Sequence, residues 1–266
     1  MKRFNWQLWA GFLLSIFAFL SYPLLFARFA STRDFPWANL LLCGVAAVLL
    51  FLGVRRAFAS GNAHPVRSKI IGGVFATLGV AILGLFVFSA FIMARWLPAS
   101  HGAPQVGQKA PDFTLADTSG RQVSLTELRT ASVANNTTTK GVLLIFYRGY
   151  WRPSCNSELR GIEANLNKFN EAGIRPVAIS VDTPQESRDL SKVAGYTFTI
   201  LSDPNTEAIR RYDLVHAGAG INGHDIARPA EFLVDSTGTV RWVNLTENYW
   251  VRARPEQILE AAKLLK

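Results

Sequence analysis

Three long apolar runs dominate the N-terminal part of this 266-residue chain. They cover about residues 6–27, 35–54 and 70–94, and none of them contains a charged side chain. An α-helix needs about 20 apolar residues to cross a hydrocarbon core of about 30 Å. The runs therefore predict three transmembrane helices, and residues 1–97 are predicted to form a membrane anchor.

The net charge of +9 is concentrated in this apolar part. Residues 1–104 contain nine Lys or Arg and one acidic residue, whereas residues 105–266 contain 19 basic and 18 acidic residues. A nearly neutral soluble part argues against nucleic acid as a partner. Basic residues before the first run and within residues 55–69 place the N-terminus in the cytoplasm by the positive-inside rule. After three spans, the C-terminal domain is predicted to lie outside the cytoplasm, on a bacterial inner or plasma membrane.

Anchoring is the simplest role for the three predicted helices. The first run is longer than the apolar core of a cleaved signal peptide, and two further runs follow it. No Asp, Glu, Lys or His lies inside the runs, although such residues usually mark transport or proton paths. Cys43 lies in the second run, where it is most simply a small buried hydrophobic residue.

The segment 98–110 is rich in Pro and Gly and predicts a linker. Over residues 105–266, strand-like and helix-like patterns then alternate. The expected strands cover residues 142–147, 177–181, 198–201, 231–235 and 240–244, and helices are expected over 153–172, from 184, over 205–212 and over 255–265. This order predicts an α/β fold in which a sheet lies between helices.

Four stretches resemble one family at the expected intervals. Residues 106–115, VGQKAPDFTL, resemble the opening segment of peroxiredoxins, the alkyl hydroperoxide reductase/thiol-specific antioxidant family. Residues 146–155, FYRGYWRPSC, resemble the turn that leads from a strand into the active-site helix. Residues 201–204, LSDP, and 228–235, RPAEFLVD, resemble the Ser-Asp-Pro turn and the cis-proline loop of these proteins. The resemblance implies a thioredoxin-like sandwich with a central mixed sheet.

Cys155 is the candidate catalytic residue. Pro153 suits the first position of a helix, where its missing N–H costs nothing. The thiol then lies in the first helical turn, beside unpaired N–H groups and the positive end of the helix dipole. Arg152 adds a positive charge nearby, and such surroundings favour the thiolate. An inert buried thiol is the alternative interpretation.

The motif departs from that of its family. Redoxins of this group carry Cys-x-x-Cys or Thr-x-x-Cys, whereas this chain has Arg152-Pro153-Ser154-Cys155. Dithiol cycling within the motif is therefore impossible, and Ser154 or Arg152 is expected to replace the missing hydroxyl. Trp151, Pro153, Ser154 and Pro229 complete the expected substrate-binding loop. The resemblance offers Arg228 as the assisting arginine, although the family position itself is occupied by Pro229.

These features lead to three hypotheses about function. The first is a one-cysteine, peroxiredoxin-like oxidoreductase that reduces hydroperoxides and is itself reduced by an external thiol. The second is a monothiol exchange protein that acts on protein disulfides. The third is a redox-inactive thioredoxin-fold module that binds a membrane partner. With two cysteines and four scattered histidines, the sequence predicts neither a metal nor any other cofactor.

Overall fold

The chain divides between Trp96 and Leu97 into an apolar helical unit and an α/β unit. The computed structural model describes residues 5–59, 66–132 and 138–265. The charged N-terminus that entered the prediction of membrane orientation, including Lys2 and Arg3, lies outside the described residues, as do residues 60–65.

Within the described residues, three helices of the first unit are long and apolar enough to cross a membrane, which confirms the predicted apolar helices. They are α1 (Trp6–Leu24), α3 (Trp37–Ala59) and α4 (Val66–Val87), with the short α2 (Ala30–Arg33) between the first two. The chain after α4 stays helical through a π turn and a 3₁₀ turn that end at Arg95. Large apolar side chains such as Leu41, Phe51 and Val80 are more than half exposed, as expected of helices that face lipid.

Helices α1 and α3 pack closely because glycines face their neighbours. A Cβ atom on Gly53 would lie 2.7 Å from the main-chain nitrogen of Leu8. A Cβ atom on Gly11 would lie 2.8 Å from the nitrogen of Leu50. Small residues of this kind let apolar helices approach where no hydrophobic effect drives them together.

The second unit is built on a seven-stranded mixed sheet in the order β2-β1-β5-β4-β3-β8-β9. The strands are β1 (Thr114–Asp117), β2 (Gln122–Ser124), β3 (Gly141–Phe146), β4 (Ile174–Ser180), β5 (Thr199–Ser202), β8 (Ala230–Asp235) and β9 (Val240–Leu245). Strands β3, β4 and β5 run parallel, whereas β8 pairs antiparallel with both β3 and β9. The short β6 (Val215–His216) and β7 (Ile226–Ala227) form a separate pair.

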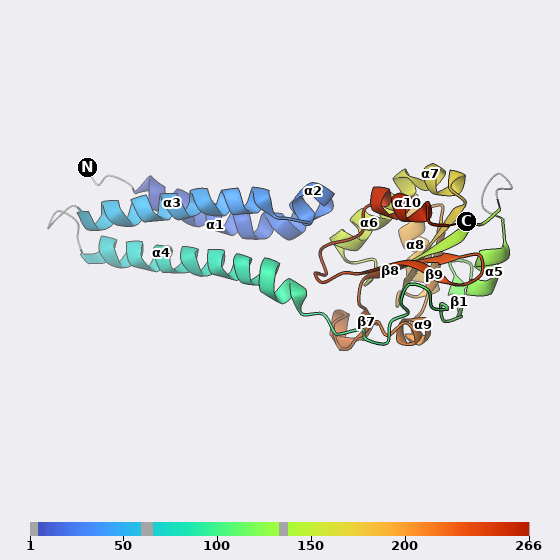
Figure 1. The fold of residues 1–266 in the computed structure, drawn as a ribbon. Helices are drawn as coiled ribbons and strands as arrows, with labels where there is room; N and C mark the ends of the chain where they lie inside the picture. Colours follow the sequence, from blue (N-terminus) through green and yellow to red (C-terminus); the bar gives the residue numbers. More distant parts are fainter. Residues whose placement is uncertain (1–4, 60–65, 133–137, 266) are drawn as a thin grey trace. The chain divides into compact units, whose positions relative to one another are not determined.

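Strand β3 divides the hydrophobic core into two layers. Leu143 and Ile145 pack in one layer, with apolar side chains of α6 (Pro153–Ala164), α7 (Leu166–Glu171), α8 (Pro184–Ala194) and α10 (Pro255–Ala262). The alternate residues Val142, Leu144 and Phe146 pack on the other face, against α5 (Leu125–Thr130) and α9 (Glu207–Arg211). Because both faces are covered, every residue of β3 is buried. Figure 1 shows these helices on the two faces of the sheet.

The predicted α/β sandwich is confirmed, with local differences. The helix expected over 153–172 is interrupted at Asn165, whose side-chain amide donates to the carbonyl of Gly161 at 2.9 Å and so competes with the helical bonding of the main chain. Strands β1 and β2 and helix α5 were not expected. The segment 98–110, predicted as a linker, is held against the second unit, since Gly107 and Ala110 donate to the carbonyls of Val240 and Gly238.

Candidate active site around Cys155

The turn between β3 and α6 depends on Gly149. Its φ of +142° lies in a region that favours glycine, and a Cβ atom there would lie 2.6 Å from Nε1 of Trp151. Asp182, just after β4, holds the turn by accepting a hydrogen bond from the main-chain N–H of Tyr150 at 2.9 Å. Pro153 then occupies the first position of α6, as the sequence predicted. The turn thereby fixes where the helix begins.

Cys155 lies in the first turn of α6 with a fully buried side chain. It packs in the core layer that contains Ile145, Tyr147 and Leu159. The sulfur nevertheless has a polar partner, because Arg252 donates a hydrogen bond from Nη2 to Sγ at 3.4 Å. The thiol is therefore placed where a guanidinium and the helix N-terminus both favour a negative charge on sulfur.

Arg252 is itself fully buried and belongs to a network of polar groups. Its Nε lies 2.8 Å from Oε2 of Glu158, one turn after Cys155 in α6. Its Nη1 donates to the carbonyls of Tyr249 and Val251 at 2.7 and 2.8 Å. Burial alone would lower the pKa of Arg252, but its interactions with Cys155 and with the carboxylate of Glu158 more than offset burial and raise its pKa. The guanidinium therefore stays charged next to the sulfur.

A second buried carboxyl group lies behind this ion pair. Glu231, in β8, accepts a hydrogen bond from the side-chain amide of Asn244 at 2.6 Å. Burial, followed by the charge of Glu158 and a hydrogen bond with it, raises the pKa of Glu231 well above its usual range. Glu231 therefore holds its proton more tightly than an exposed glutamate does, and the ion pair of Arg252 is the one with Glu158.

The charges of two further arginines also act on Cys155. Arg148 and Arg152 both lie against the ring of Tyr249, with their guanidinium carbons 5.3 and 4.8 Å from its centroid. Arg152 also lies 4.9 Å from the ring centroid of Trp151. Burial, then the charge of Arg152, lowers the pKa of Arg148 to about 9, so this guanidinium remains charged at neutral pH. Burial also lowers the pKa of Arg152, while a charge on Cys155 opposes that effect.

The structure places the predicted loop residues around the thiol. Trp151, Arg152 and Pro153 are half-buried and form the turn before Cys155. Ser154 is fully buried, and its hydroxyl has no hydrogen-bond partner among the described residues. The hydroxyl is thus a donor available close to the thiol.

Arg228 lies elsewhere in the domain. Its guanidinium donates to the carbonyl of Pro98, to the hydroxyl of Ser100 and to the carbonyl of Thr246, so it joins the start of the unit to the end of β9. The guanidinium that donates to the sulfur belongs to Arg252 instead. Pro229 is buried beside β8, and the cis bond implied by the resemblance is absent, since none of the described peptide bonds is cis. The trans form is the ordinary state of a prolyl bond, and β8 begins here without a cis turn.

Several site residues were missed by the sequence analysis, namely Arg148, Glu158, Glu231, Tyr249 and Arg252. The sequence does contain a signal for one of these residues, Glu158. Glu158 lies three residues after Cys155 and one before Leu159, on the apolar face of a predicted helix, and an acidic residue there requires a buried cation. The identity of that cation is a tertiary feature, because 97 residues separate Arg252 from Cys155 in the sequence.

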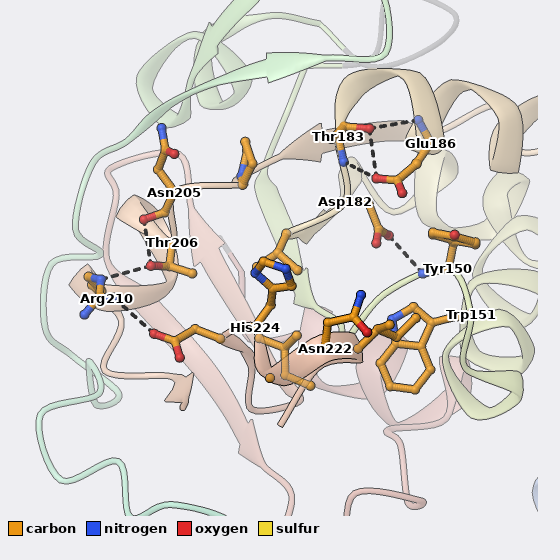
Figure 2. A pocket seen from close by; sticks show the side chains of 16 residues that line it. Tyr150, Trp151, Asp182, Thr183, Glu186, Asn205, Thr206, Arg210, Asn222 and His224 are labelled. Atoms are coloured by element: carbon orange, nitrogen blue, oxygen red, sulfur yellow. Dashed lines mark hydrogen bonds and ion pairs between the residues drawn. The ribbon is translucent and has the colours of Figure 1, made fainter. Parts of the chain in front are cut away.

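A pocket of about 770 Å³ lies on the other flank of the turn, at the carboxyl ends of β4 and β5. Tyr150 and Trp151 belong to its lining, but Cys155 does not. Figure 2 shows Asp182 bonded to the turn at Tyr150 and, across the pocket, Arg210 paired with an acidic side chain, which is Asp225. The thiol is therefore not part of this pocket, although the turn before it is.

Comparison with known proteins identifies the family. The AhpC/TSA family model matches residues 106–243. The chain belongs to the AhpC/TSA family. Alkyl hydroperoxide reductase E of Mycobacterium tuberculosis is 32% identical over 149 residues, which cover 55% of this chain and 89% of that protein. A putative peroxiredoxin of the same organism is 35% identical over 103 residues, where this chain spans only 60% of the relative's length.

Solved structures agree on the fold of this AhpC/TSA chain. The crystal structure of peroxidoxin BcpB from Mycobacterium tuberculosis aligns with a TM-score of 0.52 at 20% identity, over 61% of this chain and 99% of that one. At this identity the likeness concerns the fold alone. The family match ends before Arg252, so the arginine that contacts Cys155 lies outside the matched residues.

The raised pKa of Glu231 predicts a pH-dependent stability. The folded state holds a proton on Glu231 that the unfolded chain releases at its ordinary pKa. Glu231 therefore makes its full contribution to the free energy of unfolding at pH values below its unfolded pKa, and this contribution is lost as pH rises through its folded pKa. Glu231→Gln keeps a neutral amide that can bond both Asn244 and Glu158. We expect the variant to gain stability over the wild type as pH rises, by up to about 1.4 kcal/mol per pH unit.

Urea denaturation of the full chain in detergent, at about pH 5 and about pH 8, measures this difference. Glu260→Gln is the matched control, because its side chain is 71% exposed. Equal pH profiles for Glu231→Gln and the wild type would show that Glu231 is ionised in the folded protein.

Proposed function

We propose that this chain is a membrane-anchored thiol peroxidase, which reduces hydroperoxides at Cys155 outside the cytoplasm. The observation that carries the proposal is the hydrogen bond from buried Arg252 to the Cys155 sulfur. Membership of the AhpC/TSA family supports it, as do the names of the relatives, alkyl hydroperoxide reductase E and peroxiredoxin Bcp of Escherichia coli.

In the first step, the Cys155 thiolate attacks the distal oxygen of the hydroperoxide. A sulfur–oxygen bond forms with the electron pair of sulfur while the oxygen–oxygen bond breaks. The leaving alkoxide takes up a proton and departs as an alcohol, and Cys155 becomes a sulfenic acid. Arg252, which is held by Glu158, stabilises the thiolate before attack and the negative charge that moves onto oxygen during it. The unpaired hydroxyl of Ser154 supplies a further donor.

In the second step, an external thiol condenses with the sulfenic acid to give a mixed disulfide and water. A second thiol then releases Cys155 and leaves as the oxidised disulfide. An external reductant is required because Arg152 replaces the cysteine of the motif, and the second cysteine of the chain, Cys43, lies in α3 of the helical unit.

Burial of the sulfur favours small peroxides over protein disulfides as oxidants. The Cys155 side chain has no exposed surface, and half-buried Trp151, Arg152 and Tyr249 lie nearby. Because a peroxide is much smaller than a protein disulfide, it needs less rearrangement of this cover to reach the sulfur. A redox-inactive module would have no need for three guanidiniums whose charges act on one thiol.

The proposed location rests on the helical unit. Three helices of sufficient length and apolarity precede the redox unit, and their large apolar side chains are exposed. Basic residues at the N-terminus and within residues 55–69 favour a cytoplasmic location for both segments. The redox unit after the third span then lies on the opposite side.

Peroxide treatment of the purified chain, in the presence of a sulfenic-acid trap, is expected to give one adduct on Cys155. The adduct should be absent from Cys155→Ser and retained in Cys43→Ser, which serves as the matched control. Mass spectrometry of the peptides locates the adduct. An unmodified Cys155 in the folded wild type, or an adduct that persists in Cys155→Ser, would refute the peroxidase proposal.

Arg252→Lys is expected to slow oxidation of Cys155 about a hundredfold. Lysine keeps the positive charge but lacks the planar fork that contacts the sulfur, Glu158 and two carbonyls together. Stopped-flow measurement of single-turnover oxidation by hydrogen peroxide gives the rate constant, with circular dichroism as the check on folding. Arg160→Lys, on the exposed side of α6, is the control and should keep the wild-type rate. A folded Arg252→Lys variant with the wild-type rate would refute this role.

The orientation of the chain can be tested with single cysteines in a background that lacks Cys43 and Cys155. Val193→Cys, at a side chain that is 90% exposed, should react with a membrane-impermeant maleimide in intact, outer-permeabilised cells. Phe58→Cys, near the end of α3, should react only after lysis. The reverse pattern would place the redox unit in the cytoplasm, and release of the protein by alkaline carbonate would argue against a membrane anchor.

A further inference from the structure

The charges around Cys155 are not balanced. Arg252 has a carboxylate partner in Glu158, but neither Arg148 nor Arg152 forms an ion pair within the described residues. Arg148 is only 2% exposed, and its hydrogen bond in the described structure runs to Nδ1 of His216 at 3.1 Å. A guanidinium removed from water without a counter-charge is unfavourable. A negative charge on the Cys155 sulfur would offset only one of these two positive charges.

His216 does not supply the missing negative charge or share the positive one. Its Nδ1 accepts the hydrogen bond, since a guanidinium can only donate. Burial, followed by the charges of Arg148 and Arg152, lowers the pKa of His216 to about 4. The imidazole is thus neutral at neutral pH and orients Arg148 without changing the balance.

Arg152 is held in place by aromatic rings instead of by an acid. Its guanidinium lies 4.9 Å from the Trp151 centroid and 4.8 Å from that of Tyr249. These ring contacts and a hydrogen bond with Tyr249 hold the guanidinium in place, and its remaining N–H groups are available to a ligand. All three side chains are half-buried, so solutes can reach them from solvent. The Nε atoms of Arg148 and Arg152 are buried and have no acceptor among the described residues.

From this arrangement we propose that Arg148 and Arg152 form an anion subsite beside Cys155, which binds the carboxylate of a hydroperoxide substrate. The proposal rests on the peroxidase function above and narrows its substrate class to hydroperoxides that carry a carboxylate. A guanidinium donates in parallel to both oxygens of a carboxylate, which supplies the missing counter-charge. The carboxylate takes no part in the reaction, and the peroxide group meets the Cys155 thiolate and Arg252 as before.

The test compares a tertiary hydroperoxide that carries a short carboxylate chain with its methyl ester. Single-turnover oxidation of Cys155 is measured for both on the full chain in detergent. The wild type should react about tenfold faster with the acid than with the ester, the gain expected of one charge-assisted hydrogen bond. Arg148→Gln and Arg152→Gln should bring this ratio close to one. If a substitution changes the reactivity of the Cys155 sulfur itself, it changes the rates with the acid and with the ester equally, and their ratio is unaffected.

Arg160→Gln, which removes an exposed arginine from α6, is the matched control and should keep the wild-type ratio. If Arg148→Gln does not fold, Arg152→Gln carries the same test at a half-buried position. Equal rates for acid and ester in the wild type would overturn the anion subsite and leave the peroxidase function standing. An unchanged ratio in both folded variants would do the same. Failure of hydrogen peroxide itself to oxidise Cys155 would instead remove the proposed function.

Discussion

Arg252 can contact Cys155 only because the partners around it compensate for the burial of its guanidinium. Removal of such a charge from water costs several kcal/mol unless its donors and its charge are both satisfied. Here the guanidinium meets Glu158, two main-chain carbonyls and the sulfur. These partners come from α6 and from the segment after β9, so the arginine ties that segment to the helix that carries the thiol.

The same contact explains why the pKa of Glu231, the second buried carboxyl group, is raised. Glu158 supplies the one negative charge that Arg252 needs, and a second carboxylate would leave an excess. Glu231 instead has a raised pKa, shares a hydrogen bond with Glu158 and accepts a hydrogen bond from Asn244. The inner part of the site is thus neutral when the thiol is protonated. The outer pair, Arg148 and Arg152, adds two positive charges that interact with Cys155.

Much of this architecture could be predicted from local patterns. Strand β3 is a continuous apolar run, and Pro153 marks the start of α6, so the position of Cys155 follows from nearby residues. Strands β1 and β2 were not predicted, because they are three or four residues long and carry little periodicity. The resemblance offered Arg228 for the assisting role by its position before β8. Arg252 could not be found in this way, since its approach to Cys155 depends on the path of the chain after β9.

The replacement of a motif cysteine by Arg152 changes more than the number of thiols. In a dithiol motif, the neighbouring sulfur resolves the oxidised cysteine within the same protein, and the external reductant acts only on the disulfide that results. With Arg152 in that position, the proposed mechanism requires an external thiol to reduce the oxidised sulfur, and the surrounding groups then meet both the peroxide and the reductant. A positive charge at the entrance stabilises the thiolate and attracts anions in both steps. In the proposed mechanism, the substitution therefore removes internal resolution, and the same side chain adds a positive charge that acts on Cys155.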